Sequence, residues 1–457
     1  MRTSFLPLVL AVTAIASQAQ TFTQLVDFNN ANGAYPCCAP LVQGTDGNLY
    51  GTTDSGGITG STGTSFKVSP AGTLTTLYNF SGLHGQNPSS GVILGTDGNF
   101  YGTTEFGGSN NYGTVFKITP DGVLTTLWNF TSSSNSNPTA PLVQATNGDF
   151  YGTTTDGDAG YGSIFRITPE GALIYVHTFN GADGRTGGGA LIQAADGNLY
   201  GTTAGGGVYS FGTIFKMTPT GVLTTLHSFS ASEGQYANSA LVEKSDGVFY
   251  GTSSGGGSNN GGTVFKVTST GALTTLYSFD SPVGPGGSYP NGIIQTSDGN
   301  FYGSTLYGGS ANCSFGFDCG TIFTITPEGA LTTIYDSSAS DGGEPSSLVQ
   351  ATDGALYGTS GPTDKVAYGS LFSLSVRLHP FVEPLPAVGS VGTRVRILGT
   401  NLTHATSVNF CGTPATFNIV SNSEIMTTVP AGATSGRVQV SGPSGTLLSN
   451  VPFHVTQ

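Results

Sequence analysis

The sequence predicts an all-β fold, a seven-bladed β-propeller followed by an immunoglobulin-like β-sandwich, and three observations lead to this prediction. First, a segment resembling DGNFYGTT recurs seven times, at spacings of 49 to 55 residues, with its Tyr-Gly step at Tyr50, Tyr101, Tyr151, Tyr200, Tyr250, Tyr302 and Tyr357. Second, each repeat holds short runs rich in Val, Ile, Thr, Tyr and Phe, separated by turn residues. Third, charged residues make up 9% of the chain, whereas glycine occurs 71 times, as is typical of turn-rich extracellular β proteins.

Each repeat is predicted to be a four-stranded antiparallel meander. In the second repeat the four runs span residues 91–96, 99–104, 114–119 and 123–130. An Asp-Gly or Asn-Gly step separates the first two runs in every repeat, and it indicates a tight hairpin because both residues tolerate positive φ. A Pro-x-Gly turn precedes the fourth run wherever that run is present, except in the fifth repeat, where Ser269 takes the proline position.

The order of the runs predicts how the ring closes. The fourth run follows the pattern LTTLYxF in six repeats, but the seventh repeat ends after residues 369–376 without it. Residues 22–28, FTQLVDF, precede the first repeat and match the missing run. We therefore expect the N-terminal strand to pair onto the seventh sheet, which closes a propeller of residues 20–376 and covers its exposed edge.

The N-terminus carries the features of an export signal. Arg2 is followed by an apolar run over residues 5–16 and by the small-x-small site Ser17-Gln18-Ala19, so residues 1–19 are predicted to be a signal peptide. The run is short for a bilayer, and no later stretch is long and apolar enough, so no transmembrane segment is expected. The formal charge of −13 argues against nucleic acid as a partner. A secreted or cell-surface location follows.

The five cysteines differ in what they predict. Cys313 and Cys319 bracket a short loop and would close it as a disulfide in an oxidising compartment. Cys37 and Cys38 are adjacent and would form either a strained vicinal disulfide or two free thiols, and Cys411 has no obvious partner. Neither a CxxC pair nor a histidine cluster accompanies them, so no metal site is predicted from these cysteines.

The repeat units D-G-N-x-Y-G-T-T, G-T-V-F-K-I-T-P-x-G and L-T-T-L-Y-x-F resemble the GloVer tandem repeat of secreted bacterial proteins, over roughly residues 21–376. The resemblance implies an exported repeat protein, often followed by a C-terminal surface-sorting module. It implies no defined catalytic activity and supplies no catalytic residues.

After a linker at residues 377–383, the composition changes. Residues 384–457 contain short strands spaced by Gly, Pro and Asn turns, which predict an immunoglobulin-like sandwich. With Gly399-Thr400-Asn401-Leu402 and Val429-Pro430 in the expected order, the segment is similar to IPT/TIG domains. That resemblance implies a spacer or interaction module. Cys411 stands where the family commonly has glycine.

One end of the predicted propeller is the candidate binding surface. The loops that join the second strand to the third, and each blade to the next, emerge together at an end that we call the loop face; the tight turns lie at the opposite turn face. Variable loops on a rigid scaffold commonly bind ligands. The candidate ligand-binding aromatics are Phe106, Tyr112, Tyr161, Tyr209, Phe211, Tyr307, Phe315 and Phe317, with Tyr236 and Tyr289 in the loops between blades. Two interpretations stay open: the rings stack on sugars or protein partners, or they pack the loops against one another.

An acidic sector is predicted on the same face, where Asp54, Glu105, Asp156 and Asp158 follow the Tyr-Gly strand of the first three repeats. These carboxylates could hold Ca²⁺, serve as a catalytic pair on a glycoside, or simply be solvated. A G-x-S-x-G match at residues 251–255 is the local copy of the Tyr-Gly strand and not a strand-to-helix elbow, so no nucleophile is predicted there.

Together these features predict a secreted or cell-surface binding protein, with carbohydrate as the candidate ligand on the loop face. The alternatives are a polysaccharide lyase or hydrolase that uses the acidic sector, and a structural cell-envelope protein. Enzymatic activity is the less favoured interpretation, because no complete catalytic constellation is present. Nothing in the sequence identifies the ligand or the oligomeric state.

Overall fold

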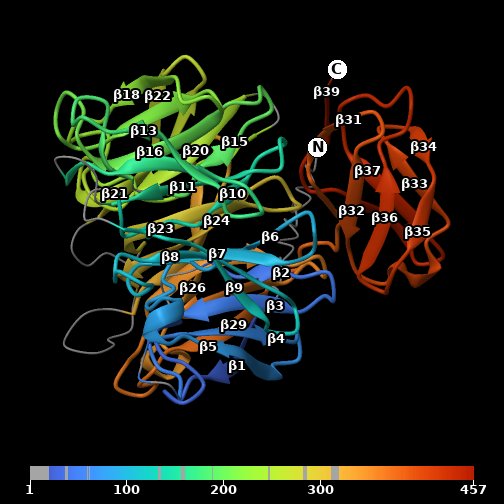
Figure 1. Cartoon of the computed structure of the whole chain (residues 1–457), viewed down its shortest axis with the longest axis horizontal. Coiled ribbons are helices and arrows are strands. Elements are labelled where there is room, and N and C mark those ends of the chain that lie inside the picture. Colours follow the sequence, from blue (N-terminus) through green and yellow to red (C-terminus); the bar gives the residue numbers. More distant parts are fainter. Residues whose placement is uncertain are drawn as a thin grey trace, which may run out of the picture.

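The computed structural model describes residues 20–36, 40–58, 60, 62–131, 135–155, 160–187, 189–244, 247–280, 286–309 and 319–456. Within these residues the protein is all-β, as predicted. Seven antiparallel sheets, one for each repeat, form the blades of a propeller, and a smaller β-sandwich follows them. Figure 1 shows the propeller, coloured from blue to orange, with the red C-terminal domain beside it.

The strands of each blade follow one another in sequence from the axis outward. Blades 1 to 3 contain β2 (Val42–Gln43), β3 (Leu49–Thr53), β4 (Thr64–Val68) and β5 (Leu74–Asn79); β6 (Val92–Leu94), β7 (Phe100–Thr104), β8 (Thr114–Ile118) and β9 (Leu124–Asn129); and β10 (Val143–Gln144), β11 (Phe150–Thr154), β12 (Ser163–Ile167) and β13 (Leu173–Thr178). Blade 4 contains β15 (Ile192–Gln193), β16 (Leu199–Gly205), β17 (Thr213–Met217) and β18 (Leu223–Ser228), and its β16 also pairs with β14 (Arg185–Gly187).

Blades 5 to 7 keep this order, apart from the outermost strand of the last blade. They contain β19 (Val242–Glu243), β20 (Val248–Ser253), β21 (Asn260–Thr268) and β22 (Leu273–Asp280); β23 (Ser288–Gln295), β24 (Phe301–Tyr307), β25 (Thr321–Ile325) and β26 (Leu331–Asp336); and β27 (Pro345–Gln350), β28 (Leu356–Ser360), β29 (Ser370–Ser375) and β1 (Thr21–Asp27). Short 3₁₀ turns lie at Gly82–His84 and Ala339–Asp341.

The N-terminal strand closes the ring, which confirms the prediction for residues 22–28. β1 pairs antiparallel with β29, with Phe22 opposite Leu374 and Gln24 opposite Phe372. In Figure 1 the blue β1 lies beside the orange strands of the last blade. The first and last segments of the repeat region therefore share one sheet.

Aromatic rings fill the junctions between blades and explain the repeat motif. At six of the seven junctions, the phenylalanine at the end of the fourth strand packs on the third-strand phenylalanine of the next blade: Phe80 lies 5.2 Å from Phe116 between ring centroids. Phe28, after β1, makes the same contact with Phe66 at 5.3 Å, across the junction that closes the ring. The motif tyrosine is tied to its own turn, since Tyr101 Oη donates to Asp97 Oδ2 at 2.9 Å.

The glycine that follows this tyrosine is required by close packing. A Cβ atom at Gly102 would lie 2.7 Å from the Cζ atom of Phe116 on the neighbouring strand. Contacts this short do not occur for real side chains, so only glycine leaves room here for the phenylalanine ring of the neighbouring strand. In each Tyr-Gly step, the tyrosine supplies a buried ring and the glycine leaves space for this phenylalanine.

The C-terminal domain is a sandwich of two main sheets. The first has the order β30 (Glu383–Leu385), β32 (Arg394–Leu398), β36 (Glu424–Thr428) and β35 (Phe417–Ile419); the second has the order β34 (Thr413–Ala415), β33 (Ser407–Phe410), β37 (Val438–Gly442) and β38 (Gly445–Leu448). β31 (Val388–Ser390) pairs in parallel with β39 (His454–Thr456), and a 3₁₀ turn spans Leu402–His404. Val395, Ile425, Val440 and Phe453 lie in its core.

Cys411 shows how this domain accommodates its departure from the family pattern. Its φ is 46°, in the left-handed region that favours glycine, and its thiol is free and exposed. A Cβ atom at Gly436 would meet the Cys411 sulfur at 2.4 Å, so the glycine at 436 makes room for the cysteine side chain.

Candidate functional site

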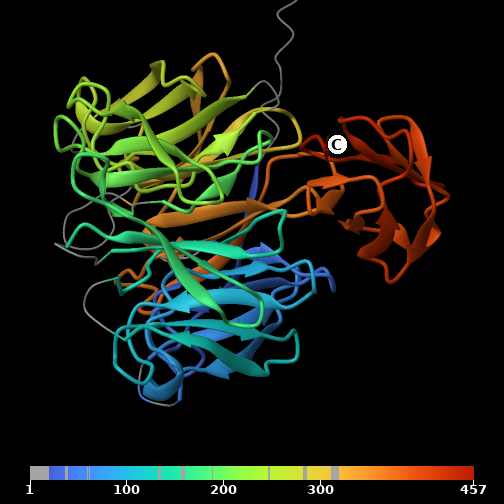
Figure 2. The same cartoon turned by 45° about the horizontal axis from the view of Figure 1, so that its top comes forward.

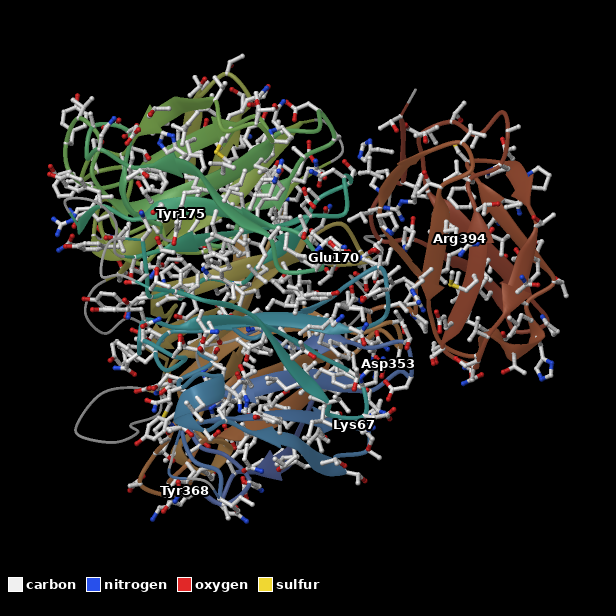
Figure 3. All side chains as sticks on the ribbon, in the orientation of Figure 1. Lys67, Glu170, Tyr175, Asp353, Tyr368 and Arg394 are labelled. Carbon is white, nitrogen blue, oxygen red and sulfur yellow. The ribbon has the colours of Figure 1, made fainter. Side chains whose placement is uncertain are left out.

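The turn face of the propeller is covered by the C-terminal segment. The seven first-to-second-strand turns surround the axis at this face, and in both views the red domain stands at one side of the propeller (Figures 1 and 2). Figure 3 labels Lys67, Glu170 and Asp353 on the side toward this domain, whereas Tyr368 lies away from it.

Hydrogen bonds fix this cover to four of the blades. They join Ser423 Oγ to Thr45 O (2.7 Å), Arg396 Nε to Thr96 O (3.0 Å), Ser297 Oγ to His379 O (3.1 Å) and Phe381 N to Thr352 O (3.2 Å). Because the acceptors in blades 1, 2 and 7 are backbone carbonyls of the turns, the domain is held in a defined position over the axis.

A cavity of about 490 Å³ follows the axis between the blades. Every blade contributes to its wall, through Pro40, Ile93, Leu142, Ala190, Ala240, Ile293 and Leu348 among others. The polar groups in this wall include Asn238, Asn291 and Ser347, and none of the described lining residues is charged. The cavity can therefore offer amide and hydroxyl hydrogen bonds but no ion pair.

A ring of left-handed residues surrounds the loop-face end of the axis. We call these residues, whose φ lies between 38° and 59°, the mouth ring: Tyr35, Asn87, Asn137, Thr186, Tyr236, Tyr289 and Glu344. In five of them, all except Thr186 and Tyr289, the backbone carbonyl accepts a hydrogen bond from the N–H of the residue that follows the second strand of a blade; Tyr35 O accepts from Asp54 N at 3.0 Å. Positive φ is uncommon for non-glycine residues and costs free energy, so the regular backbone of the blade must impose it.

Five of the seven mouth-ring residues come directly before a proline: Pro36, Pro88, Pro138, Pro290 and Pro345. The combination of this step with a spacing of about 50 residues is the sequence signal that could have revealed the ring. Tyr236 and Tyr289 were predicted on this face as aromatic rings, and the other five members were not predicted.

Acidic side chains gather on one side of the mouth. Asp54 and Glu105 hold equivalent positions after β3 and β7, and Asn87 lies between them: its Nδ2 donates to Asp54 O at 3.1 Å and to Asp54 Oδ2 at 3.4 Å, and its carbonyl accepts from Glu105 N at 3.0 Å. Burial raises the pKa of Asp54, and the hydrogen bond from Asn87 partly offsets this rise. In blade 3 the equivalent residue is Thr155, while Asp156 and Asp158 lie outside the described residues.

Glu344, which the sequence analysis missed, adds a third acid to this side. It belongs to the mouth ring of blade 7, next to blade 1, and burial raises the pKa of its carboxyl. Among the described residues no group of three His, Cys, Asp or Glu side chains is placed to hold a metal ion. Calcium at the acidic sector stays a prediction.

A second hollow lies across the ring, at the rim of blades 3 to 5. This rim pocket has a volume of about 590 Å³. Its side chains include Tyr161, Asn180, Arg185, Thr186, Ser210 and Tyr236. The Arg185 guanidinium carbon stands 6.0 Å from the centroid of the Tyr161 ring, within reach of a cation–π contact.

Comparison with protein families accounts for most of the chain. The model of the Gloeobacter/Verrucomicrobia repeat matches residues 11–157 and 131–316, which together exceed half of the sequence. The chain belongs to this repeat family. The IPT/TIG domain model matches residues 382–455, in agreement with the sandwich described above. Comparison with curated proteins gives no match.

Solved structures resemble this Gloeobacter/Verrucomicrobia repeat protein at low identity. A fungal alcohol oxidase of the AA5 family, in complex with copper, is 12% identical with a TM-score of 0.56, over 96% of this chain and 99% of the oxidase. A gluconolactonase from Xanthomonas campestris is 12% identical (TM-score 0.37; 78% and 94% covered), and an auxiliary nutrient binding protein from Bacteroides ovatus is 14% identical (TM-score 0.38; 71% and 76% covered). The likeness to the oxidase supports the fold alone.

The predicted aromatics of this repeat protein divide between exposed and packed rings. Phe106 and Tyr209 are exposed, whereas Tyr112, Tyr161 and Phe211 pack on the cores between blades. Tyr307 meets Tyr289 edge-to-face at 5.8 Å. Phe315 and Phe317 lie outside the described residues. The described rings come from blades 2, 3, 4 and 6, so they are distributed around the loop face and do not form one platform.

The cysteines are described in part. Cys319 is buried and disulfide-bonded, but its partner lies outside the described residues, so the pairing with Cys313 stays a prediction. Cys37 and Cys38 also lie outside them. None of the described residues belongs to a helix that is long and apolar enough to cross a membrane.

Proposed function

We propose that this protein is a secreted or cell-surface binding protein that holds a carbohydrate on the loop face of its propeller. The observation that carries the proposal is the asymmetry of the two faces. The C-terminal domain covers the turn face around the axis, whereas the loop face presents the mouth ring and the rim pocket. A ligand that engages the propeller near its axis therefore has the loop face as its open approach.

The chemistry of the loop face supports a sugar ligand. Tyr35 and Tyr236 are 43% and 54% exposed, and each offers an apolar ring with a polar tip. The amide NH₂ groups of Asn87 and Asn137 are hydrogen-bonded to Asp54 and Glu105, whereas the axial cavity beneath offers hydroxyls and amides. Rings that stack, beside groups that both donate and accept hydrogen bonds, match the apolar faces and hydroxyls of a sugar.

Two observations support export. Residues 1–19 have the pattern of a signal peptide, and Cys319 forms a disulfide, a bond that persists in oxidising compartments. Both are consistent with a protein that works outside the cytoplasm.

A glycan array with the mature chain tests the proposal. We expect saturable binding to at least one glycan, and Tyr35→Ala or Tyr236→Ala should weaken it about tenfold, equivalent to about 1.4 kcal/mol. Val222→Ala is the control, because Val222 is an exposed apolar side chain in the turn before β18, at the turn face. Failure to bind any glycan, or an equal loss in the control, would contradict the proposal.

A polysaccharide lyase or hydrolase is the second candidate, and the raised pKa of Asp54 favours it. A raised pKa makes a carboxyl group a better candidate for a general acid, and Glu105 and Glu344 belong to the adjacent blades. Under this alternative, Asp54→Asn abolishes release of sugar products while glycan binding survives. Product release that is unchanged in Asp54→Asn would remove Asp54 from consideration as the acid.

A further inference from the structure

The rim pocket has the size and composition of a small-ligand site. Its volume of about 590 Å³ lies in the range typical of such sites. Its wall combines a cation, two phenols, an amide and two hydroxyls with the backbone of Ala204 to Gly206. Three consecutive blades supply these groups, so a ligand here would bridge neighbouring repeats.

Arg185 is the distinctive residue of this pocket. It is exposed at the start of β14, where it pairs with Gly205, and the next residue, Thr186, donates its N–H to Tyr161 O at 2.8 Å. The backbone on both sides of the guanidinium is therefore fixed.

The charge of Arg185 is available to a ligand. Two other cations of the propeller have acidic partners: Lys216 Nζ lies 2.7 Å from Asp196 Oδ2, and Arg166 Nε lies 3.4 Å from Asp149 Oδ2. Within the described part of the chain, Arg185 forms no such pair. On a protein with a formal charge of −13, an exposed arginine in a pocket without a described carboxylate partner is suited to an anionic group.

The other side chains supply contacts for the body of a ligand. Asn180 Oδ1 accepts from Ala182 N at 2.9 Å and from Asp183 N at 3.2 Å, which fixes the side chain and leaves its NH₂ group to donate. The Tyr236 ring lies over Gly255, where an added Cβ would be 3.3 Å from the ring, and its carbonyl accepts from Ser254 N at 3.3 Å. Tyr236 therefore stands in a fixed place with more than half of its surface open to ligand.

The charges around the mouth favour one orientation of an anionic ligand. Glu344, Asp54 and Glu105 belong to blades 7, 1 and 2, whereas Arg185 belongs to blade 4, across the closed ring. The carboxylates of the first side repel an anion, whereas Arg185 attracts one; the carboxylate of Asp183, two residues before Arg185, lies 3.0 Å from His177 Nε2.

We propose that the rim pocket binds a carboxylated sugar, with the Arg185 guanidinium on the carboxylate, the Tyr236 ring against the sugar face and the Asn180 amide on a hydroxyl. The planar guanidinium matches a carboxylate with two parallel hydrogen bonds. This inference rests on the proposed function and gives it a substrate class, the uronic-acid polysaccharides.

The test compares an oligomer of galacturonic acid with its fully methyl-esterified form, which lacks the negative charge but keeps the sugar ring. We expect the acidic oligomer to bind the mature chain more tightly, and Arg185→Gln to weaken that binding roughly ten- to a hundredfold, as loss of a charged hydrogen bond does. Arg185→Gln should weaken binding of the esterified oligomer much less, because that ligand carries no negative charge for the guanidinium to attract. Lys365→Gln is the matched control, because it removes one exposed cation from the same face, in blade 7, and it should leave both affinities unchanged.

Each outcome decides the inference. Equal affinity for the two oligomers, or equal effects of Arg185→Gln and Lys365→Gln, would overturn it, while saturable binding of neutral glycans would leave the proposed function intact. Absence of binding by any glycan would overturn both. Since Arg185 is exposed, both variants should melt with the parent protein, and a shared melting temperature shows that a loss of binding is not a loss of fold.

Discussion

The closing strand should matter to stability as much as an internal blade junction does, and Phe28→Ala tests this. Phe28 is 3% exposed and lies 5.3 Å from Phe66, while Phe80 is fully buried and lies 5.2 Å from Phe116. The two residues hold equivalent positions, one after β1 and the other after β5. Truncation of a buried phenylalanine removes about 3–5 kcal/mol of folding free energy. Phe28→Ala and Phe80→Ala should therefore lower the free energy of unfolding by similar amounts within that range.

Urea denaturation followed by tryptophan and tyrosine fluorescence measures both losses. Phe106→Ala is the control, because Phe106 is exposed on a loop and its truncation should cost less than about 1 kcal/mol. An unfolding curve of Phe28→Ala that overlays the parent, beside a shifted curve of Phe80→Ala, would refute the reasoning. In that case β1 would not hold the ring closed in solution.

Three other predictions concern charge and titration. Arg396→Ala removes the guanidinium from the buried Glu424 carboxylate and should lower the unfolding free energy of the C-terminal domain by about 3 kcal/mol. In calorimetry, the double variant Arg396→Ala/Glu424→Gln should recover part of this loss, because it no longer buries an unpaired charge. A double variant that recovers nothing would contradict the pairing. Burial raises the pKa of Asp54, so the contribution of this residue to stability is full below the ordinary carboxyl pKa and is lost as the pH rises through the pKa of the folded state. The Asp54→Asn variant should therefore have a higher melting temperature than the parent protein near pH 7 and the same melting temperature near pH 3. The reverse order would contradict this prediction. Burial, the nearby charge of Asp298 and a hydrogen bond to Asp298 raise the pKa of Tyr302 to about 12. The contribution of Tyr302 to stability is therefore complete below the ordinary tyrosine pKa of about 10 and is lost as the pH rises through the pKa of the folded state. Absorbance titration should show the strand tyrosines ionising at higher pH than the exposed tyrosines, and a single transition near pH 10 would contradict this prediction.

The blades were predictable because their signals are local and repeated. The run at residues 99–104 corresponds to β7, Phe100–Thr104, and the run at residues 22–28 corresponds to β1, Thr21–Asp27. Turn residues and β-branched runs act within one blade, and seven copies make the pattern unambiguous. Ring closure followed from counting, since one strand was missing at one end and present at the other.

The position of the C-terminal domain could not be predicted in this way. Its contacts with the turn face use Ser423 and Arg396 as donors, and their acceptors are the backbone carbonyls of Thr45 and Thr96. Every residue has a carbonyl, so residue type does not mark such an acceptor. The C-terminal domain docks on the turn face and leaves the loop face open, and this arrangement depends on the shapes of the two surfaces and not on a local sequence pattern.

The candidate site was predicted in part for similar reasons. The loop face and Asp54 followed from the meander, but left-handed backbone at Thr186 and Tyr236 has no signal in residue type, since both side chains disfavour it. Arg185 lies on β14, a strand outside the four-stranded pattern, so comparison of the repeats does not bring it to notice. The aromatic rings of this face were predicted from the sequence, but the cation beside them was not.

Hydrogen–deuterium exchange of the mature chain, with and without a saturating amount of its best-binding glycan, tests the central claim most directly. The account predicts slower exchange in residues 180–187, 204–212 and 234–237 of the loop face, and unchanged exchange in β32 and β36 of the C-terminal domain. Protection confined to the C-terminal domain or to the turns beneath it would contradict the claim that the loop face is the binding surface.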